Sequence, residues 1–235
     1  MQHRTIRGTV RYLGDTVGER GREWFTVTVH GNGHRTMRAQ CEMEDSGVLR
    51  DVTFTVNERF QPLDAFIRLS VKDQFMGSGW FRFADTFAEC EVITADAGRI
   101  SQRFDLGGRA PSFGAHPVAC DIWHLPQFDR SRGPRKDVIA GVLMSSNLPN
   151  GASGPLLAFY PGGLAIRYAG PETVTVPAGT FATEHFIFEK DGRPPQHCWC
   201  MVPDFTIVKI RSELLKTTYE LTAFSDTPGR QSSGV

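Results

Sequence analysis

Several features are scarce in this 235-residue chain, and each scarcity excludes a class of protein. An excess of either charge is missing, because 26 Lys+Arg balance 26 Asp+Glu. A neutral chain without a basic block lacks the electrostatic footprint that binds a phosphate backbone, so we expect no nucleic-acid partner. No run approaches the roughly 20 consecutive apolar residues of a spanning helix, so we expect no membrane insertion.

Targeting signals and paired cysteines are scarce as well. Residues 1–4 lead into alternating sequence without the apolar core of a signal peptide, which predicts a cytoplasmic location. Five cysteines, an odd number, favour reduced thiols over a disulfide framework in that compartment. Cys198 and Cys200 point to one face of a strand, but a structural zinc site would need a second pair.

Helical periodicity is equally rare, and alternation of apolar with polar residues fills almost all of the sequence before residue 104. We expect strands at 4–12, 24–30, 34–43, 52–56, 63–71, 76–83, 87–93 and 99–104. Neighbouring strands joined by such short turns must be mostly antiparallel. The predicted fold class is therefore all-β, a long antiparallel meander that forms a strongly curved sheet or an open barrel.

The alternation fails at about 106–137, where glycines, prolines and aromatic residues are mixed. So long an irregular insert is usually functional or mobile, and its aromatic residues predict that it packs across an opening of the sheet as an insert or lid. The one or two short helices that we expect lie here. Further strands are expected at 138–145, 156–160, 164–168, 172–176, 180–189, 198–202, 206–211 and 217–224. We predict one β domain over 1–224 and a flexible tail over 225–235; two β sub-domains that meet at the insert are the alternative.

The last third contains a recognisable turn. Residues 171–181 read PETVTVPAGTF, followed by Glu-His-Phe at 184–186, by Trp199 and by Asp204. This pattern resembles a bacterial family of antiparallel β domains of unknown function, which are curved half-barrels of lipocalin-like shape. The resemblance covers about 168–221 well and the first hundred residues only in pattern. It implies a concave sheet with an aromatic interior that suits a small apolar ligand.

The insert holds the densest group of titratable residues. His116, Asp121 and His124 are candidate catalytic residues, because a histidine beside a carboxylate can transfer a proton near neutral pH. Asp121 would orient one of the imidazoles. Phe113 and Trp123 are expected to line a ligand pocket and exclude water. The simpler alternative is that both histidines only satisfy the loop backbone. The same residues match no strong metal-site spacing, so we expect no metal and no cofactor.

A second group lies on the later strands. Tyr160 and Arg167 are the candidates to stabilise a developing oxyanion. Tyr168, His185 and Trp199 are the remaining candidate ligand-binding residues. A histidine on a partly apolar strand face is more often a satisfied core residue, and that alternative applies to His185.

Three functions remain open. The first is a cofactor-independent enzyme, such as an isomerase, hydratase, lyase or cyclase, that acts on an apolar or aromatic small molecule in a β-barrel pocket. The second is a non-catalytic intracellular binder or carrier of such a molecule, and the third is a structural or assembly protein. The grouped acidic and basic residues favour the enzyme. A homodimer is compatible with each of the three functions. No Gly-x-Ser-x-Gly elbow and no phosphate-binding glycine loop is present.

Overall fold

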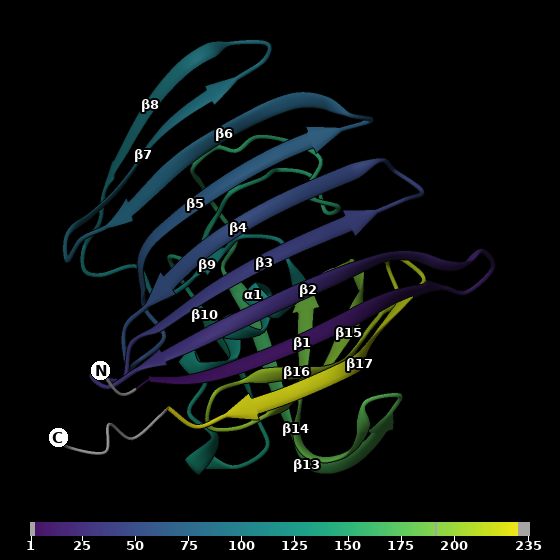
Figure 1. Ribbon diagram of the computed structural model, residues 1–235. Coiled ribbons are helices and arrows are strands. Elements are labelled where there is room, and N and C mark those ends of the chain that lie inside the picture. The colour runs from purple at the N-terminus through teal and green to yellow at the C-terminus, as the bar shows by residue number, and fades with distance from the viewer. Residues whose placement is uncertain (1–2, 191, 230–235) are drawn as a thin grey trace, which may run out of the picture.

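The protein is described by a computed structural model that covers residues 3–190 and 192–229, of which 62% lie in strands. Figure 1 shows a broad curved sheet with short helices and loops gathered on its inner side. None of the helices in the described part of the chain is long and apolar enough to cross a membrane.

The first half of the sheet is a regular meander in which each strand pairs antiparallel with the next. Alternate side chains of β1 to β7 are buried, as in β4, so one face of each of these strands supplies the core, whereas alternate side chains of the edge strand β8 are only half-buried. This confirms the predicted meander. Its strands are β1 (His3–Gly14), β2 (Gly18–His30), β3 (Arg35–Met43), β4 (Val48–Val56), β5 (Pro62–Val71), β6 (Gln74–Phe83), β7 (Phe87–Thr94) and β8 (Gly98–Asp105).

The second half continues the same sheet. Its strands are β10 (Lys136–Ile139), β13 (Leu164–Val176), β14 (Gly179–Lys190), β15 (Arg193–Met201), β16 (Thr206–Ser212) and β17 (Thr217–Thr227). Strand β17 pairs with β1, which joins the halves into one 14-stranded sheet in the order β10-β13-β14-β15-β16-β17-β1-β2-β3-β4-β5-β6-β7-β8. The edge strands β10 and β8 are not neighbours in this order, so the curved sheet is an open barrel.

The end of the chain differs from the prediction. Strand β17 continues to Thr227, beyond the expected strand end at residue 224, because residues 225–227 pair with β1. Residues 228–229 follow the strand without regular structure, and the last part of the expected tail, 230–235, lies outside the described residues.

The irregular region is longer than expected and runs from 106 to 163; we call residues 106–163 the inner segment. Instead of the strands expected at 138–145 and 156–160, the structure has β10 and two strands of two residues each, at 143–144 and 158–159. Gly141, at φ 73°, ends the extended backbone between β10 and the strand at 143–144. The elements of the inner segment other than β10 are β9 (Phe113–Gly114), α1 (Val118–Asp121), η1 (Ile122–Gln127), η2 (Arg130–Arg132), β11 (Leu143–Met144) and β12 (Ala158–Phe159). Strands β12, β11 and β9 form a separate 3-stranded sheet.

The inner segment fills the curve of the sheet and supplies much of the core. The ring of Phe113 lies 4.9 Å from that of Phe83 and 5.9 Å from that of Phe54, and the ring of Trp123 lies 5.7 Å from Phe60. Phe113 and Trp123 are 1% and 2% exposed. The expectation that these two side chains line a ligand pocket is wrong, because the sheet strands already surround them. They are packing residues that hold the inner segment to the sheet.

Candidate functional site

A cavity of about 530 Å³ lies between the inner segment and the strands of the second half. We call its side chains His116, Asp121, His124 and Tyr160 the polar end. The other polar lining residues are Ser146, Asn147, Glu189, Arg193, Gln196 and Ser212. The apolar side chains of its wall are Val142, Leu143, Met144, Leu148, Pro149, Pro161, Leu164, Phe188, Pro194, Leu214 and Leu215. The cavity therefore combines a largely apolar wall with a small group of titratable side chains, the usual composition of a small-molecule site.

Arg50 of β4 fixes the loops around the polar end. Its side chain is fully buried and donates from Nε to the Ala115 carbonyl (3.0 Å), from Nη1 to the Gly151 carbonyl (2.9 Å) and from Nη2 to Ser145 Oγ (2.7 Å). Burial lowers the pKa of Arg50 to about 10, which leaves it charged at neutral pH. One side chain of the sheet thus holds three separate points of the inner segment.

Glu23 of β2 holds the start of α1 in the same way. The buried carboxylate accepts hydrogen bonds from Tyr12 Oη (2.6 Å), the Val118 amide (2.7 Å) and the Ala119 amide (2.9 Å). These amides belong to the first turn of α1, whose N–H groups have no partner within the helix. Burial raises the pKa of Glu23 to about 7. Because α1 ends at Asp121, the contact sets the position of that carboxylate.

His124 presents a neutral imidazole to the cavity. Its Nδ1 lies 2.6 Å from Ser112 Oγ, and its ring meets the edge of Phe188 at 6.3 Å. Burial lowers the pKa of His124 to about 4, since no charged partner compensates for the lost hydration. At neutral pH the ring can donate one hydrogen bond and accept another, but it carries no charge.

His116 and Asp121 lie together, although not as expected. The His116 amide, not its ring, donates to Asp121 Oδ1 (3.2 Å), and no hydrogen bond or ion pair joins Asp121 to either imidazole among the described residues. The hydrogen bond that Asp121 accepts thus comes from the backbone of His116 and not from an imidazole, and the orienting role of Asp121 stays a prediction. The carboxylate instead stabilises the backbone of His116, which has a φ of 84°.

Both groups have shifted pKa values. Burial, assisted by the nearby Arg50 charge, lowers the pKa of His116 to about 3. Burial raises the pKa of Asp121 to about 6, although the His116 amide and Arg50 oppose the shift. Near neutral pH both cavity histidines are neutral, and Asp121, with a pKa of about 6, is mostly ionised.

Of the two residues predicted to stabilise an oxyanion, Tyr160 and Arg167, only Tyr160 lines the cavity. Burial raises the pKa of Tyr160, while the Arg193 charge lowers it. Arg167 lies elsewhere: it alternates outward on β13 between the buried Ile166 and Tyr168, is half-exposed and pairs with Glu189. The expectation for Arg167 is therefore wrong, and Arg193 of β15 is the arginine that lines the cavity.

The remaining predicted ligand residues do not line the cavity. Tyr168 is buried and donates from Oη to Glu184. His185 stacks on Trp199 with ring centroids 4.4 Å apart, and Trp199 Nε1 donates to Glu172 Oε2 (2.7 Å). His185 faces away from its fully buried neighbour Phe186, as alternation requires, so this stacked pair belongs to the outer side of the sheet.

Sequence reasoning missed Glu23 and Arg50, although a signal was present. Glu23 shares a strand face with Phe25 and Val27, and Arg50 shares one with Val52 and Phe54. A charged residue in an otherwise apolar alternation is buried if the alternation is regular, and a buried charge requires partners. All five cysteines are buried free thiols. Within residues 3–190 and 192–229, no group of three His, Cys, Asp or Glu side chains is placed to hold a metal ion.

Comparison with known proteins adds one structural similarity. No protein-family model matches the chain, and no curated protein matches it either. The chain is similar to the crystal structure of a β-barrel-like protein of a domain of unknown function, DUF1849, from Brucella abortus, with a TM-score of 0.47 and 8% sequence identity. The similarity covers 95% of this chain and 97% of that one.

Proposed function

We propose that the protein binds a small apolar or aromatic molecule that carries a hydrogen-bonding group, in the cavity between the inner segment and strands β14 to β16. The observation that carries the proposal is the pairing of an apolar wall with two neutral imidazoles at one end. The neutral imidazoles can donate and accept hydrogen bonds that fix the orientation of a ligand, and the charged side chains of Glu189 and Arg193 also line the cavity. Leu148, Leu214 and Leu215 offer contacts to the apolar body of the ligand.

Binding is favoured over catalysis by the state of the titratable groups. An imidazole with a pKa of about 3 or 4 is a weak base at neutral pH and carries almost no proton to donate as an imidazolium. Asp121 already accepts a backbone hydrogen bond, and Arg167 lies outside the cavity.

A cofactor-independent enzyme is the second candidate, and the geometry at Gly114 supports it. A Cβ atom built on Gly114 would lie 3.4 Å from His124 Nε2 and 3.8 Å from Asp121 Oδ1. A ligand atom near that point could therefore contact both groups. With a pKa of about 6, Asp121 would be the base that takes a proton from the ligand, and His124 would hold the ligand by a hydrogen bond.

The test uses a neutral aromatic amine, N-phenyl-1-naphthylamine, whose fluorescence increases in an apolar site. We expect saturable binding with one molecule per chain. Gly114→Val should weaken binding at least about tenfold, about 1.4 kcal/mol, because its methyl groups occupy the space between His124 and Asp121. Gly107→Val is the matched control, since a Cβ there meets nothing within 4 Å.

Two results would contradict the proposal: no saturable binding to the wild type, or equal binding by both variants with normal melting temperatures. To separate binder from enzyme, the small molecules that co-purify with the protein are identified by mass spectrometry and incubated with it. Recovery of the unchanged molecule supports the binder, whereas conversion that Asp121→Asn abolishes supports the enzyme.

A further inference from the structure

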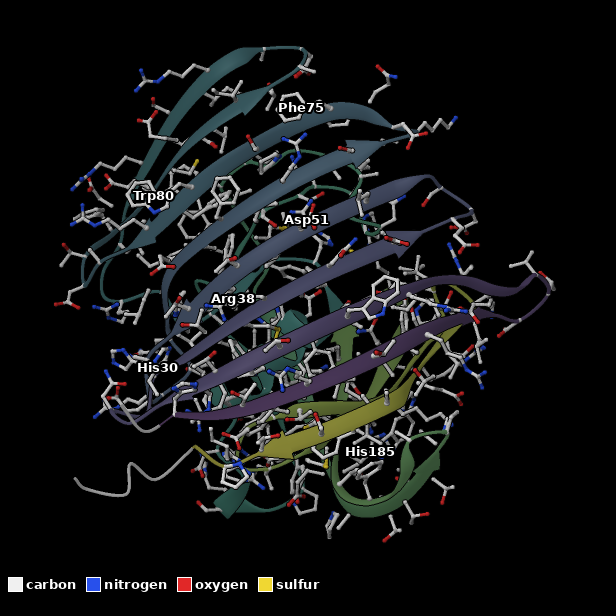
Figure 2. The ribbon with its side chains drawn as sticks, in the orientation of Figure 1. His30, Arg38, Asp51, Phe75, Trp80 and His185 are labelled. Atoms are coloured by element: carbon white, nitrogen blue, oxygen red, sulfur yellow. The ribbon has the colours of Figure 1, made fainter. Side chains whose placement is uncertain are left out.

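The outer face of the sheet carries two cross-strand rows of aromatic and polar side chains. In one row Trp24 of β2 lies opposite Gln40 of β3, which lies opposite Asp51 of β4. In the other row the neighbours are Thr26, Arg38, Thr53, Phe66 and Trp80, from β2 to β6. Figure 2 shows Arg38, Asp51 and Trp80 on this outer face, on the side of the sheet opposite the inner segment.

The aromatic residues of these rows are unusually exposed. Trp24 is 39% exposed, Phe66 50% and Trp80 40%. They belong to central strands whose other face is fully packed, so the core does not require aromatic side chains at these positions. Exposed aromatic side chains on one sheet face offer apolar ring surface to a ligand.

Two of these rings border a hollow of about 320 Å³. Trp24 lies on one side of the hollow and Phe66, three strands away, on the other. Neighbouring strands are about 4.8 Å apart and Phe66 is offset by two residues from the register of Trp24, so the two Cα atoms are separated by roughly 16 Å. The lining residues are Trp24, Phe25, Thr26, Arg38, Ala39, Gln40, Asp51, Val52, Thr53 and Phe66.

Polar groups of mixed character lie between the rings. Arg38 is a cation, Asp51 an anion, Gln40 an amide, and Thr26 and Thr53 are hydroxyls, so donors and acceptors are interleaved without a net charge. Asp51 has no ion pair within the described part of the chain, because its neighbour Arg68 lies over the Phe75 ring, 5.1 Å from the centroid. Its carboxylate is therefore available to a ligand.

These features select one kind of occupant. A peptide strand cannot add here, since β2 to β5 are paired on both sides. An anionic ligand would meet Asp51, and a cationic one would meet Arg38. The outer side of a curved sheet is convex (Figure 1), so two copies would touch over little area, whereas a small ligand can lie in the hollow.

From this geometry we infer that the hollow between Trp24 and Phe66 is a binding site for a neutral carbohydrate. A pyranose ring presents C–H groups on its faces, which pack on aromatic rings, and hydroxyls at its edge, which both donate and accept hydrogen bonds. The Trp24 and Phe66 rings would contact the sugar faces. Asp51 would contact vicinal hydroxyls through both of its carboxylate oxygens. Arg38, which donates from Nη1 to Thr28 Oγ1 (3.3 Å), and Gln40, which donates from Nε2 to Glu42 Oε1 (3.0 Å), would contact hydroxyls through their other polar atoms.

The inference is tested with three soluble neutral probes, maltotetraose, cellotetraose and chitotetraose, in titrations followed by calorimetry. We expect at least one to bind with one molecule per chain. Trp24→Ala and Phe66→Ala should each weaken that binding about tenfold or more, and Asp51→Asn by a smaller factor. Ile93→Ala, an exposed apolar residue of β7 outside the hollow, is the control that should bind as the wild type does.

Three outcomes would overturn the inference. The first is that none of the probes binds at millimolar concentration. The second is that binding occurs but is unchanged in folded Trp24→Ala and Phe66→Ala. The third is a wild-type dimer, seen by sedimentation, that Trp24→Ala converts to monomer, because the face would then be a contact between copies. Bound N-phenyl-1-naphthylamine should leave sugar binding unchanged, which distinguishes this site from the cavity.

Discussion

The meander of residues 3–105 and the inner segment of residues 106–163 are stabilised by different kinds of interaction. The meander is held by backbone pairing between neighbouring strands and by apolar side chains that alternate into the core. The inner segment has little regular pairing and is fixed by aromatic packing and by two buried charged residues of the meander, Arg50, which donates hydrogen bonds to it, and Glu23, which accepts them from it. Periodicity therefore predicts the first region, while single residues determine the second.

The largest effect is expected for Arg50→Met. The variant leaves the Ala115 and Gly151 carbonyls and the Ser145 hydroxyl without their buried donor, so unfolding in urea should show a loss of about 3–5 kcal/mol. Arg38→Met, on the neighbouring strand but exposed, is the control and should change stability by less than about 0.5 kcal/mol. Equal losses in the two variants would mean that the inner segment does not depend on Arg50.

A pH-dependent difference is expected for Glu23→Gln. Burial raises the folded-state pKa of Glu23 from 4.5 to about 7, so its contribution to stability is complete below pH 4.5 and is lost as the pH rises through 7. Across that interval the wild type should lose about 3 kcal/mol relative to the variant. Thermal unfolding of both proteins from pH 4 to pH 8 measures the difference, and parallel stability curves would refute the assignment.

Ser112→Ala should have a smaller effect. The hydroxyl lies 2.6 Å from Nδ1 of the buried His124, so its removal leaves a ring nitrogen unsatisfied and should cost about 1–2 kcal/mol. Binding of N-phenyl-1-naphthylamine should weaken as well, because the ring orientation is then less fixed. Ser101→Ala, on the exposed edge strand, provides the reference in the same denaturation and binding assays. If Ser112→Ala matched this reference in both, His124 would need no support from Ser112.

Arg167→Ala should have the smallest effect. The exposed pair with Glu189 contributes less than about 1 kcal/mol, and the residue does not line the cavity. Ligand binding by this variant should equal that of the wild type in the fluorescence titration. A clear loss of affinity would contradict this prediction and show that Arg167 contributes to ligand binding.

The success of sequence reasoning follows the same division between regions. Alternation in β1 to β8 predicted the meander because each strand buries one face on one continuous core. The density of titratable residues in the insert located the cluster of His116, Asp121 and His124, which lines the cavity. Sequence reasoning did less well at other positions. It failed for Phe113 and Trp123, because whether an aromatic loop residue faces a core or a cavity depends on the sheet that surrounds it. It failed for Arg167 because the direction of that side chain depends on the register of β13, which the sequence did not define.

The most direct test of the binding proposal is a nuclear magnetic resonance titration of the His116 and His124 imidazole nitrogens, with and without N-phenyl-1-naphthylamine. Because burial lowers their pKa values to about 3 and 4, both rings should remain neutral from pH 8 to pH 5. Both should also change chemical shift when the probe binds, whereas His185 on the outer side should not. Protonation of either cavity ring near pH 6.5, or probe binding that leaves both rings unchanged, would contradict a neutral polar end that contacts the ligand.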